Sequence, residues 1–133
     1  MIEVYIDGAS AGNPGLSGAG IFIKSHHNTD NYSIPLGMMS NHEAEFSALV
    51  KSLEICLESK FQIVSVRSDS SLVVEAIEKR FVKNDIYRPF LDQALMLISN
   101  FDLFFIKWIS SKENKQADQL ARRAIRLNNS RSQ

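Results

Sequence analysis

The pattern of apolar and polar residues near the N-terminus predicts three strands. In the first, Ile2, Val4 and Ile6 alternate with more polar residues, which is the period of a half-buried strand. The stretch Gly8–Gly20 is rich in Gly, Ser, Asn and Pro and is predicted to be a long turn. The polar stretch His26–Asp30 is predicted to be a hairpin loop. The predicted strands, which would form an antiparallel meander, are Ile2–Asp7, Ala19–Lys24 and Asn31–Gly37.

Beyond residue 40 the apolar residues recur with the period of an α-helix. Ser40 and Glu43 have the spacing of a capping box at the start of the first helix. Ser110 and Glu113 repeat this spacing and predict the start of the last helix, which is expected to end near Leu127. The segments predicted between these helices are a buried strand parallel to the first, two helices and a fifth strand, at Gln62–Arg67, Ser70–Arg80, Ile86–Ser99 and Leu103–Ile109.

The predicted order of elements, β-β-β-α-β-α-α-β-α, indicates an α/β fold with one mixed five-stranded sheet. A three-stranded antiparallel meander and two parallel strands would form the sheet, with helices on both faces. The chain has 133 residues, close to the usual size of a single domain. We expect residues 1–127 to form that domain and residues 128–133 to be a frayed C-terminal tail.

The sequence excludes several kinds of site and location. Cys56 is the single cysteine, so neither an internal disulfide nor a cysteine-based zinc site can form. It lies at helical spacing from Leu53 and Leu57, which predicts a buried core thiol. The N-terminus does not have the pattern of a signal peptide, and no apolar run approaches the ~18 residues of a membrane span. We therefore expect a cytoplasmic protein with no membrane contact. A monomer is a separate expectation, which these patterns do not establish.

The formal net charge is zero, with 15 basic and 15 acidic residues, so the molecule exerts no long-range attraction on a polyanion. The charges are unevenly distributed, however. Residues 1–60 contain three basic and seven acidic side chains, whereas residues 101–133 contain seven basic and three acidic ones. Any nucleic-acid site must therefore be local, and the basic C-terminal third is its candidate surface. A solvated helix face is the alternative explanation for these charges.

Four carboxylates lie at or near the ends of predicted elements, where solubility does not require them. Asp7 ends the first strand, and a turn with Gly8 would explain it locally. Asp69 follows the fourth strand, where it would also serve as a helix N-cap. Glu45 borders the apolar stripe of the first helix, where a side chain that merely reaches solvent is the alternative. Asp118 is expected inside the last helix, where Asp is unfavourable by roughly 0.5–0.7 kcal/mol relative to Ala, so a functional role is favoured.

Together, these four carboxylates indicate a site for divalent cations. In a sheet of this order the first and fourth strands can lie side by side and parallel, so Asp7 and Asp69 would meet at one edge. Two helices flank that edge, which would allow Glu45 and Asp118 to join them. Gathered carboxylates repel one another and require a cation to neutralise them. Oxygen ligands without a Cys or His cluster favour Mg²⁺ or Mn²⁺, and a pair of such ions can act on a phosphodiester.

Four segments around these carboxylates resemble the sequence motifs of the type 1 ribonuclease H family. The first reads DGASAGNPG and is followed, as in the family, by a Gly-Ala-Gly segment. The second reads SNHEAE and the third SDS, and in the fourth an Asn precedes the Asp by four residues. The four segments are Asp7–Gly15, Ser40–Glu45, Ser68–Ser70 and Asn114–Ala121. The resemblance covers residues 1–127, with all four motifs in the family's order.

The resemblance implies an endonuclease that cuts the RNA strand of RNA/DNA hybrids by two-metal-ion hydrolysis, leaving 5′-phosphate and 3′-hydroxyl ends. Two Mg²⁺ ions are the implied cofactors, with Mn²⁺ as a substitute. One ion would activate the attacking water and the other would stabilise the departing 3′ oxygen. The residues that match the family's catalytic and metal-binding carboxylates are Asp7, Glu45, Asp69 and Asp118. Asp7 is expected to bridge the two ions.

The resemblance also implies which residues contact the hybrid. Gly12, Asn13 and Asn41 match positions that contact its minor groove, where the 2′-hydroxyl distinguishes RNA from DNA. Ser40 matches a hydroxyl that holds a phosphate of the DNA strand, although a helix cap is an equal explanation. Asn114, from the fourth motif, completes the expected substrate contacts.

Two departures from the family pattern leave alternatives open. Members usually carry a His, or sometimes an Arg, in the loop before the last helix, and it is thought to help the product leave. The corresponding loop here, Ile109–Glu113, has neither, and Lys112 is a point charge rather than a proton shuttle. Only Phe81–Asn84 separates the second and third helices, so the chain is of the short kind without a basic handle. The alternatives are a nucleic-acid-binding module of this fold that cleaves weakly or not at all, and an exonuclease or strand-transfer enzyme of the wider fold group.

Overall fold

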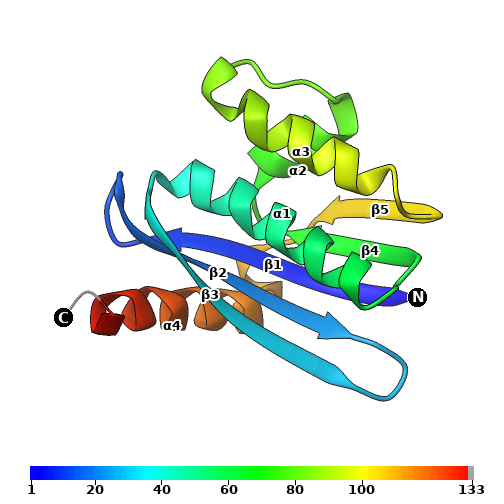
Figure 1. Cartoon of the computed structure of the whole chain (residues 1–133), viewed down its shortest axis with the longest axis horizontal. Coiled ribbons are helices and arrows are strands. Elements are labelled where there is room, and N and C mark those ends of the chain that lie inside the picture. Colours follow the sequence, from blue (N-terminus) through cyan, green and yellow to red (C-terminus); the bar gives the residue numbers. More distant parts are fainter. Residues whose placement is uncertain (132–133) are drawn as a thin grey trace.

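The computed structural model describes residues 1–131, with side chains up to Leu127, and confirms the predicted α/β fold. Five strands form one mixed sheet in the order β3-β2-β1-β4-β5 (Figure 1). β1 is antiparallel to β2 and parallel to β4, β2 is antiparallel to β3, and β4 is parallel to β5. The strands are β1 (Ile2–Ser10), β2 (Gly15–Lys24), β3 (Thr29–Met39), β4 (Ile63–Ser68) and β5 (Leu103–Trp108). The helices are α1 (Asn41–Glu58), α2 (Ser71–Lys79), α3 (Arg88–Ile98) and α4 (Lys115–Arg131), with short 3₁₀ helices η1 (Asp85–Tyr87) and η2 (Ser111–Glu113).

Helices cover both faces of the sheet, as predicted. Figure 1 shows α1, α2 and α3 on one side of the sheet and α4 on the other. α1 packs on β1 and β2, α3 packs on α1, and α4 packs across the three antiparallel strands. The predicted core thiol is confirmed: Cys56 is 1% exposed, and burial raises its pKa to about 12, so it is no reactive thiolate. The largest fully buried apolar side chains include Phe46, Ile6, Ile21, Ile23, Leu49 and Leu53. Within residues 1–131, no helix combines the length and apolarity needed to cross a membrane.

The prediction of a long turn at residues 8–20 is wrong. β1 and β2 extend into this stretch from both ends and leave only residues 11–14 between them. Glycine favours turns in a sequence, but inside a strand it also permits another backbone to come unusually close. Composition does not distinguish a glycine in a turn from a glycine that another backbone approaches, because the approaching helix lies far away in the sequence.

Two of the glycines allow helices to close on the sheet from opposite faces. A Cβ on Gly8 would lie 2.2 Å from the carbonyl oxygen of Ala44 in α1. A Cβ on Gly20 would lie 2.0 Å from the carbonyl oxygen of Ala117 in α4. Gly20 pairs with Asp7 across the β1–β2 ladder, and Gly8 is the next residue along the chain. Both helices are therefore held close to the end of β1.

The start of α1 is confirmed, and that of α2 is revised. The Ser40 hydroxyl accepts a hydrogen bond from the backbone N–H of Glu43 at 3.2 Å, and the Glu43 carboxylate accepts one from the backbone N–H of Ser40 at 2.9 Å. The N-cap of α2 is Ser70, whose side chain accepts from the helix backbone. The alternative explanation of Asp69 as an N-cap is therefore wrong, and its carboxylate is left for other contacts.

The last helix begins later and ends later than predicted. The capping box of Ser110 and Glu113 exists, but it opens η2 rather than α4. Asp118 therefore lies in the first turn of α4 rather than in the helix interior. In the first turn the helix dipole favours a carboxylate. α4 continues to Arg131, past its predicted end at Leu127, because extending a helix requires no new nucleation. Positions 132–133 of the predicted tail lie outside the described residues.

Candidate functional site

The parallel pairing of β1 with β4 brings two candidate carboxylates together. Ile6 and Ser68 form the last pair of the β1–β4 ladder, so the next residues lie side by side: Asp69 directly follows β4, whereas Asp7 lies within β1 rather than at its predicted end. The parallel ladder ends here, at the carboxyl end of β4, which is where α/β folds place their chemistry. Their carboxylates are close enough for a hydrogen bond when Asp7 carries a proton.

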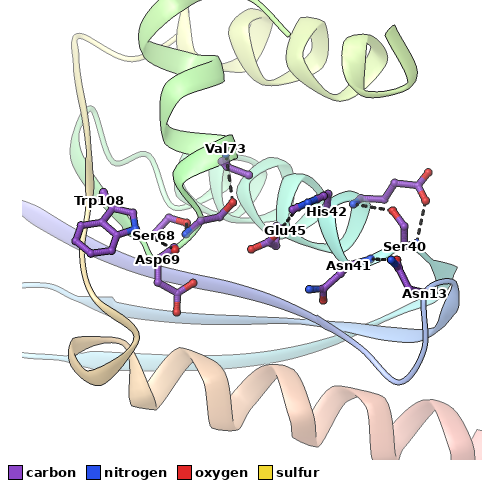
Figure 2. A network of polar contacts seen from close by, with 11 residues as sticks. Asn13, Ser40, Asn41, His42, Glu45, Ser68, Asp69, Val73 and Trp108 are labelled. Atoms are coloured by element: carbon purple, nitrogen blue, oxygen red, sulfur yellow. Dashed lines mark hydrogen bonds and ion pairs between the residues drawn. The ribbon is translucent and has the colours of Figure 1, made fainter. Parts of the chain in front are cut away.

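The two flanking helices supply the other two carboxylates. Glu45 comes from α1 and Asp118 from the first turn of α4, and both line the same open cavity as Asp7 and Asp69. The cavity has a volume of about 590 Å³, and all four side chains are half-buried in its wall. Figure 2 shows the carboxylate of Asp69 directed toward α4, and it shows Glu45 on α1. The structure thus brings together all four predicted carboxylates.

Asp7 lies at the electrostatic centre of the cavity. Burial raises the pKa of Asp7, and the negative charge of Asp69 raises it further. A hydrogen bond with Asp118, together with the charges of Asp118 and Glu45, brings the pKa of Asp7 to about 8. Asp7 is therefore mostly protonated at neutral pH when no cation is present, whereas a cation would favour its ionised form.

Glu45 and Asp69 are each held by donors from neighbouring elements. Burial raises the pKa of Glu45, although hydrogen bonds from His42 and Ser70 act against the rise. Burial also raises the pKa of Asp69, against a hydrogen bond from Asn114. In both residues the desolvation of the carboxylate outweighs the stabilising donors.

Asp118 makes an ion pair within its own helix. The Arg122 Nε lies 3.2 Å and 3.1 Å from the two carboxylate oxygens of Asp118. Among the described residues, no three Asp, Glu, His or Cys side chains yet converge closely enough to ligate one ion. Asp118 is paired with Arg122 within α4, so its side chain must rotate before the four carboxylates can share a cation.

We expect the metal-free protein to lose stability as the pH rises from about 5 to about 8. The raised pKa of Asp7 means that the folded state binds this proton more tightly than the unfolded state. The resulting stabilisation is present at low pH and is lost as the pH rises through about 8, with a slope of at most roughly 1.4 kcal/mol per pH unit for one proton. The raised pKa values of Glu45 and Asp69 act in the same direction. Thermal unfolding in a chelator measures the effect, and a Tm that rises over this range would contradict it.

The residues predicted to contact a hybrid lie beside the cavity, with one exception. The Asn13 side-chain oxygen accepts a hydrogen bond from the backbone N–H of Asn41 at 3.0 Å, which fixes the β1–β2 turn to the start of α1 (Figure 2). Gly12, Asn13 and Asn41 are exposed, and Ser40 is half-buried. These four residues form a continuous rim, and Asn41 also lines the cavity itself.

Asn114 is the exception, because it is 1% exposed and cannot reach a substrate. Its amide nitrogen donates to the backbone oxygen of Ile6 at 2.8 Å, directly before Asp7. Its backbone oxygen accepts from the N–H of Asp118 at 3.1 Å, so Asn114 joins β1 to the start of α4. Its predicted contact with the substrate is replaced by a structural role in holding Asp7 and Asp118 together.

Several residues of the site were not predicted from the sequence. Arg122 and Arg126 line the cavity. Arg122 lies one helical turn after Asp118 and Arg126 lies one turn further, and this spacing was a signal that could have identified them. Trp108 donates its indole N–H to the backbone oxygen of Asp69 at 3.0 Å, and no sequence pattern indicated this contact. His42 contacts Glu45 at 2.8 Å, at a helical spacing of three residues.

Known proteins share both the sequence and the fold of this chain. The family model described as reverse transcriptase-like matches residues 5–124. A ribonuclease H of Chlorobium phaeobacteroides is 32% identical, with 96% of this chain and 97% of that protein covered. The chain belongs to the ribonuclease H family. Its predicted membership of type 1 ribonuclease H, a family of hydrolytic nucleases that depend on divalent metal ions, is thereby confirmed.

Two further relatives extend the comparison. EbsB of Enterococcus faecalis is 43% identical over 127 residues, which cover 94% of both chains. The crystal structure of LC11-RNase H1 in complex with an RNA/DNA hybrid matches this fold with a TM-score of 0.88 and 28% sequence identity. The match covers 96% of the present chain and 99% of LC11-RNase H1. Some relatives are longer, and the chain spans 64% of the ribonuclease HI of Halobacterium salinarum.

Proposed function

We propose that this ribonuclease H family member is an endonuclease that hydrolyses the RNA strand of RNA/DNA hybrids. The products would carry 5′-phosphate and 3′-hydroxyl ends. The observation that carries the proposal is the gathering of four carboxylates in one open cavity, beside the point where the parallel ladder of β1 and β4 ends. LC11-RNase H1, solved with an RNA/DNA hybrid, shares the fold across nearly its whole length, and this likeness supports the substrate class.

The donor set of the cavity suits a pair of Mg²⁺ ions, or Mn²⁺ in their place. It consists of carboxylate oxygens, which hard divalent cations prefer. Asp7 is buried among other acids and holds a proton near neutral pH, so a cation would remove an unfavourable interaction there. Its position between Asp69 and Asp118 is the reason to assign Asp7 the bridging role. When bound, such ions supply an activated water and stabilise the departing 3′ oxygen.

The rim residues are placed to hold the hybrid beside the carboxylates. Asn13 and Asn41 are tied together, so their polar groups form one edge suited to the minor groove, with Gly12 beside them. The Ser40 oxygen accepts from the N–H of Glu43, which leaves its hydroxyl proton free to donate to a phosphate of the DNA strand. Capping the helix and binding a phosphate are therefore compatible uses of Ser40.

A weakly cleaving or inactive hybrid-binding module is the second candidate. It is favoured by the loop before α4, where η2 presents Ser111 and Lys112 to solvent and contains no His or Arg. The four carboxylates would still allow such a module to bind cations, but the release of product would be slow.

The deciding experiment is cleavage of an end-labelled RNA/DNA hybrid by the whole chain, with Mg²⁺ and separately with Mn²⁺. We expect internal cuts in the RNA strand that disappear when a chelator removes the metal. The same duplexes made of DNA alone and of RNA alone serve as controls and should remain intact. An uncut hybrid that still binds would support the binding module. An uncut and unbound hybrid would refute both candidates.

We further propose that the protein acts in the cytoplasm as a monomer, with the hybrid as its partner and without membrane contact. The single buried Cys56 suits a reducing compartment, since folding requires no disulfide. Sedimentation analysis would test the monomeric state.

A further inference from the structure

His42 contacts the carboxylate cluster from the rim of the cavity. It lies in the first turn of α1, and its Nδ1 is 2.8 Å from Oε1 of Glu45 (Figure 2). A carboxylate only accepts, so Nδ1 carries the proton and donates it. The His42 side chain is 54% exposed, whereas that of Glu45 is 15% exposed. The contact therefore covers Glu45 from the solvent side.

Aromatic packing fixes the orientation of the His42 ring. Tyr87, from η1, meets the imidazole edge-on, with ring centres 6.0 Å apart and planes at 86°. Tyr87 also stacks on Phe46 with centres 5.4 Å apart, and Phe46 is fully buried. The short connection between α2 and α3 thus supports the imidazole from the core, so that Nδ1 faces Glu45 rather than solvent.

The hydrogen bond from His42 restricts a side chain that otherwise has several rotamers. Glu45 has three side-chain torsions, and a metal site requires its ligands to be held within a narrow range of orientations. Ser70, the N-cap of α2, donates a second hydrogen bond to Glu45. Each carboxylate oxygen has two lone pairs, so these two donors orient Glu45 and still leave it able to bind a cation.

We propose that His42 is a positioning residue, which by its hydrogen bond to Glu45 holds that carboxylate in place for a divalent cation. The inference rests on the proposed function, because it assigns Glu45 to the metal site. His42 acts on Glu45 through Nδ1. Tyr87, in the short α2–α3 connection, orients the imidazole ring of His42. Removing such a donor to a metal ligand typically weakens metal binding or activity by roughly 10–100-fold.

Two substitutions separate this role from a contact through the other ring nitrogen. The side-chain amide of Asn can place a donor where the Nδ1 of His lies, whereas the amide of Gln places it nearer to Nε2. His42→Asn should therefore recover most of the Mn²⁺ affinity that His42→Ala loses, and His42→Gln should not. His26→Ala removes an exposed imidazole from the β2–β3 loop and is the matched control.

Tyr87→Ala tests how the ring is oriented. It should weaken Mn²⁺ binding less than His42→Ala does, because it acts only through the imidazole. The double variant with His42→Ala and Tyr87→Ala should bind Mn²⁺ no more weakly than His42→Ala alone. Additive losses from the two substitutions would overturn the coupling between Tyr87 and His42.

The experiment is a calorimetric titration of the metal-free chain with MnCl₂ in the absence of hybrid, with thermal unfolding to verify the fold. We expect His42→Ala to raise the Kd for Mn²⁺ by about 10-fold or more. In the cleavage assay the same substitution should lower kcat at saturating hybrid with little change in KM. If the wild-type chain binds Mn²⁺ and His42→Ala binds it equally well, the inference fails while the proposed function stands. Restoration by His42→Gln but not by His42→Asn would also overturn it. A wild-type chain that binds no Mn²⁺ would overturn both.

Discussion

Replacing Asp7 with Asn is expected to lower the rate of hybrid cleavage by at least ~10³-fold, because Asp7 occupies the centre of the proposed metal site. Metal ions supply several kcal/mol of charge stabilisation in the transition state, and each factor of ten in rate corresponds to roughly 1.4 kcal/mol. An amide is nearly the same size as a carboxylate but has one oxygen and no charge, so it is a poor bridge between cations. The rate is measured at saturating hybrid in Mg²⁺.

The same substitution is expected to stabilise the metal-free protein. At neutral pH the folded chain carries Asp7 beside Asp69, Asp118 and Glu45, which raise the free energy of its ionised form. Folding at neutral pH therefore requires Asp7 to take up a proton, a cost that the neutral amide of Asn does not have. The Tm in chelator should rise by roughly 3–10 °C, equivalent to about 1–2 kcal/mol for a domain of this size. The fall in Tm between about pH 5 and about pH 8 should also become shallower in the variant.

Lost activity together with gained stability distinguishes a functional carboxylate from a structural one. If Asp7 were only a residue of the β1–β2 ladder, Asn, which is nearly the same size, would leave both quantities nearly unchanged. A Tm that falls in Asp7→Asn would mean that the carboxylate stabilises the fold, which would contradict our interpretation. Asp92→Asn, at an exposed position of α3, controls for the removal of one negative charge elsewhere.

Gly20→Ala is expected to destabilise the protein by about 3 kcal/mol, at the upper end of the range for overpacked sites. The added Cβ would lie 2.0 Å from the carbonyl oxygen of Ala117 and 2.4 Å from the backbone nitrogen of Ala121. Both contacts are with backbone atoms of α4, so relief requires moving the helix rather than turning a side chain. Denaturant unfolding should show the loss, and the Tm should fall by roughly 10 °C or more.

The displacement of α4 should also weaken metal binding, because α4 carries Asp118 to the end of β1. Gly37→Asn is the control glycine substitution. Gly37 has a φ of +79°, which Asn tolerates better than other residues, and a Cβ there meets nothing within 4 Å. We expect Gly37→Asn to change stability by less than about 1 kcal/mol. A similarly small effect of Gly20→Ala would show that the helix packs less closely on β2 than the structure indicates.

Local sequence pattern was sufficient for the order of the elements and for the four carboxylates. Alternation and helical periodicity depend only on which face of an element is buried, so they predicted all five strands and the helices between them. Asp7 and Asp69 could be paired in advance because both follow apolar runs that a parallel register places side by side. The capping box at Ser40 was equally local, since the N–H that it binds belongs to Glu43, three residues later.

The tertiary structure decided what each residue does once distant elements meet. The sequence alone could not separate a glycine in a turn from Gly8 or Gly20, whose missing side chains admit backbones from α1 and α4. Nor could it show that Asn114 is buried against Ile6 rather than exposed to a substrate. The support of His42 by Tyr87 depends on how the α2–α3 connection packs on α1. Periodicity records only that a face is buried, whereas contacts between distant segments depend on which surfaces come together.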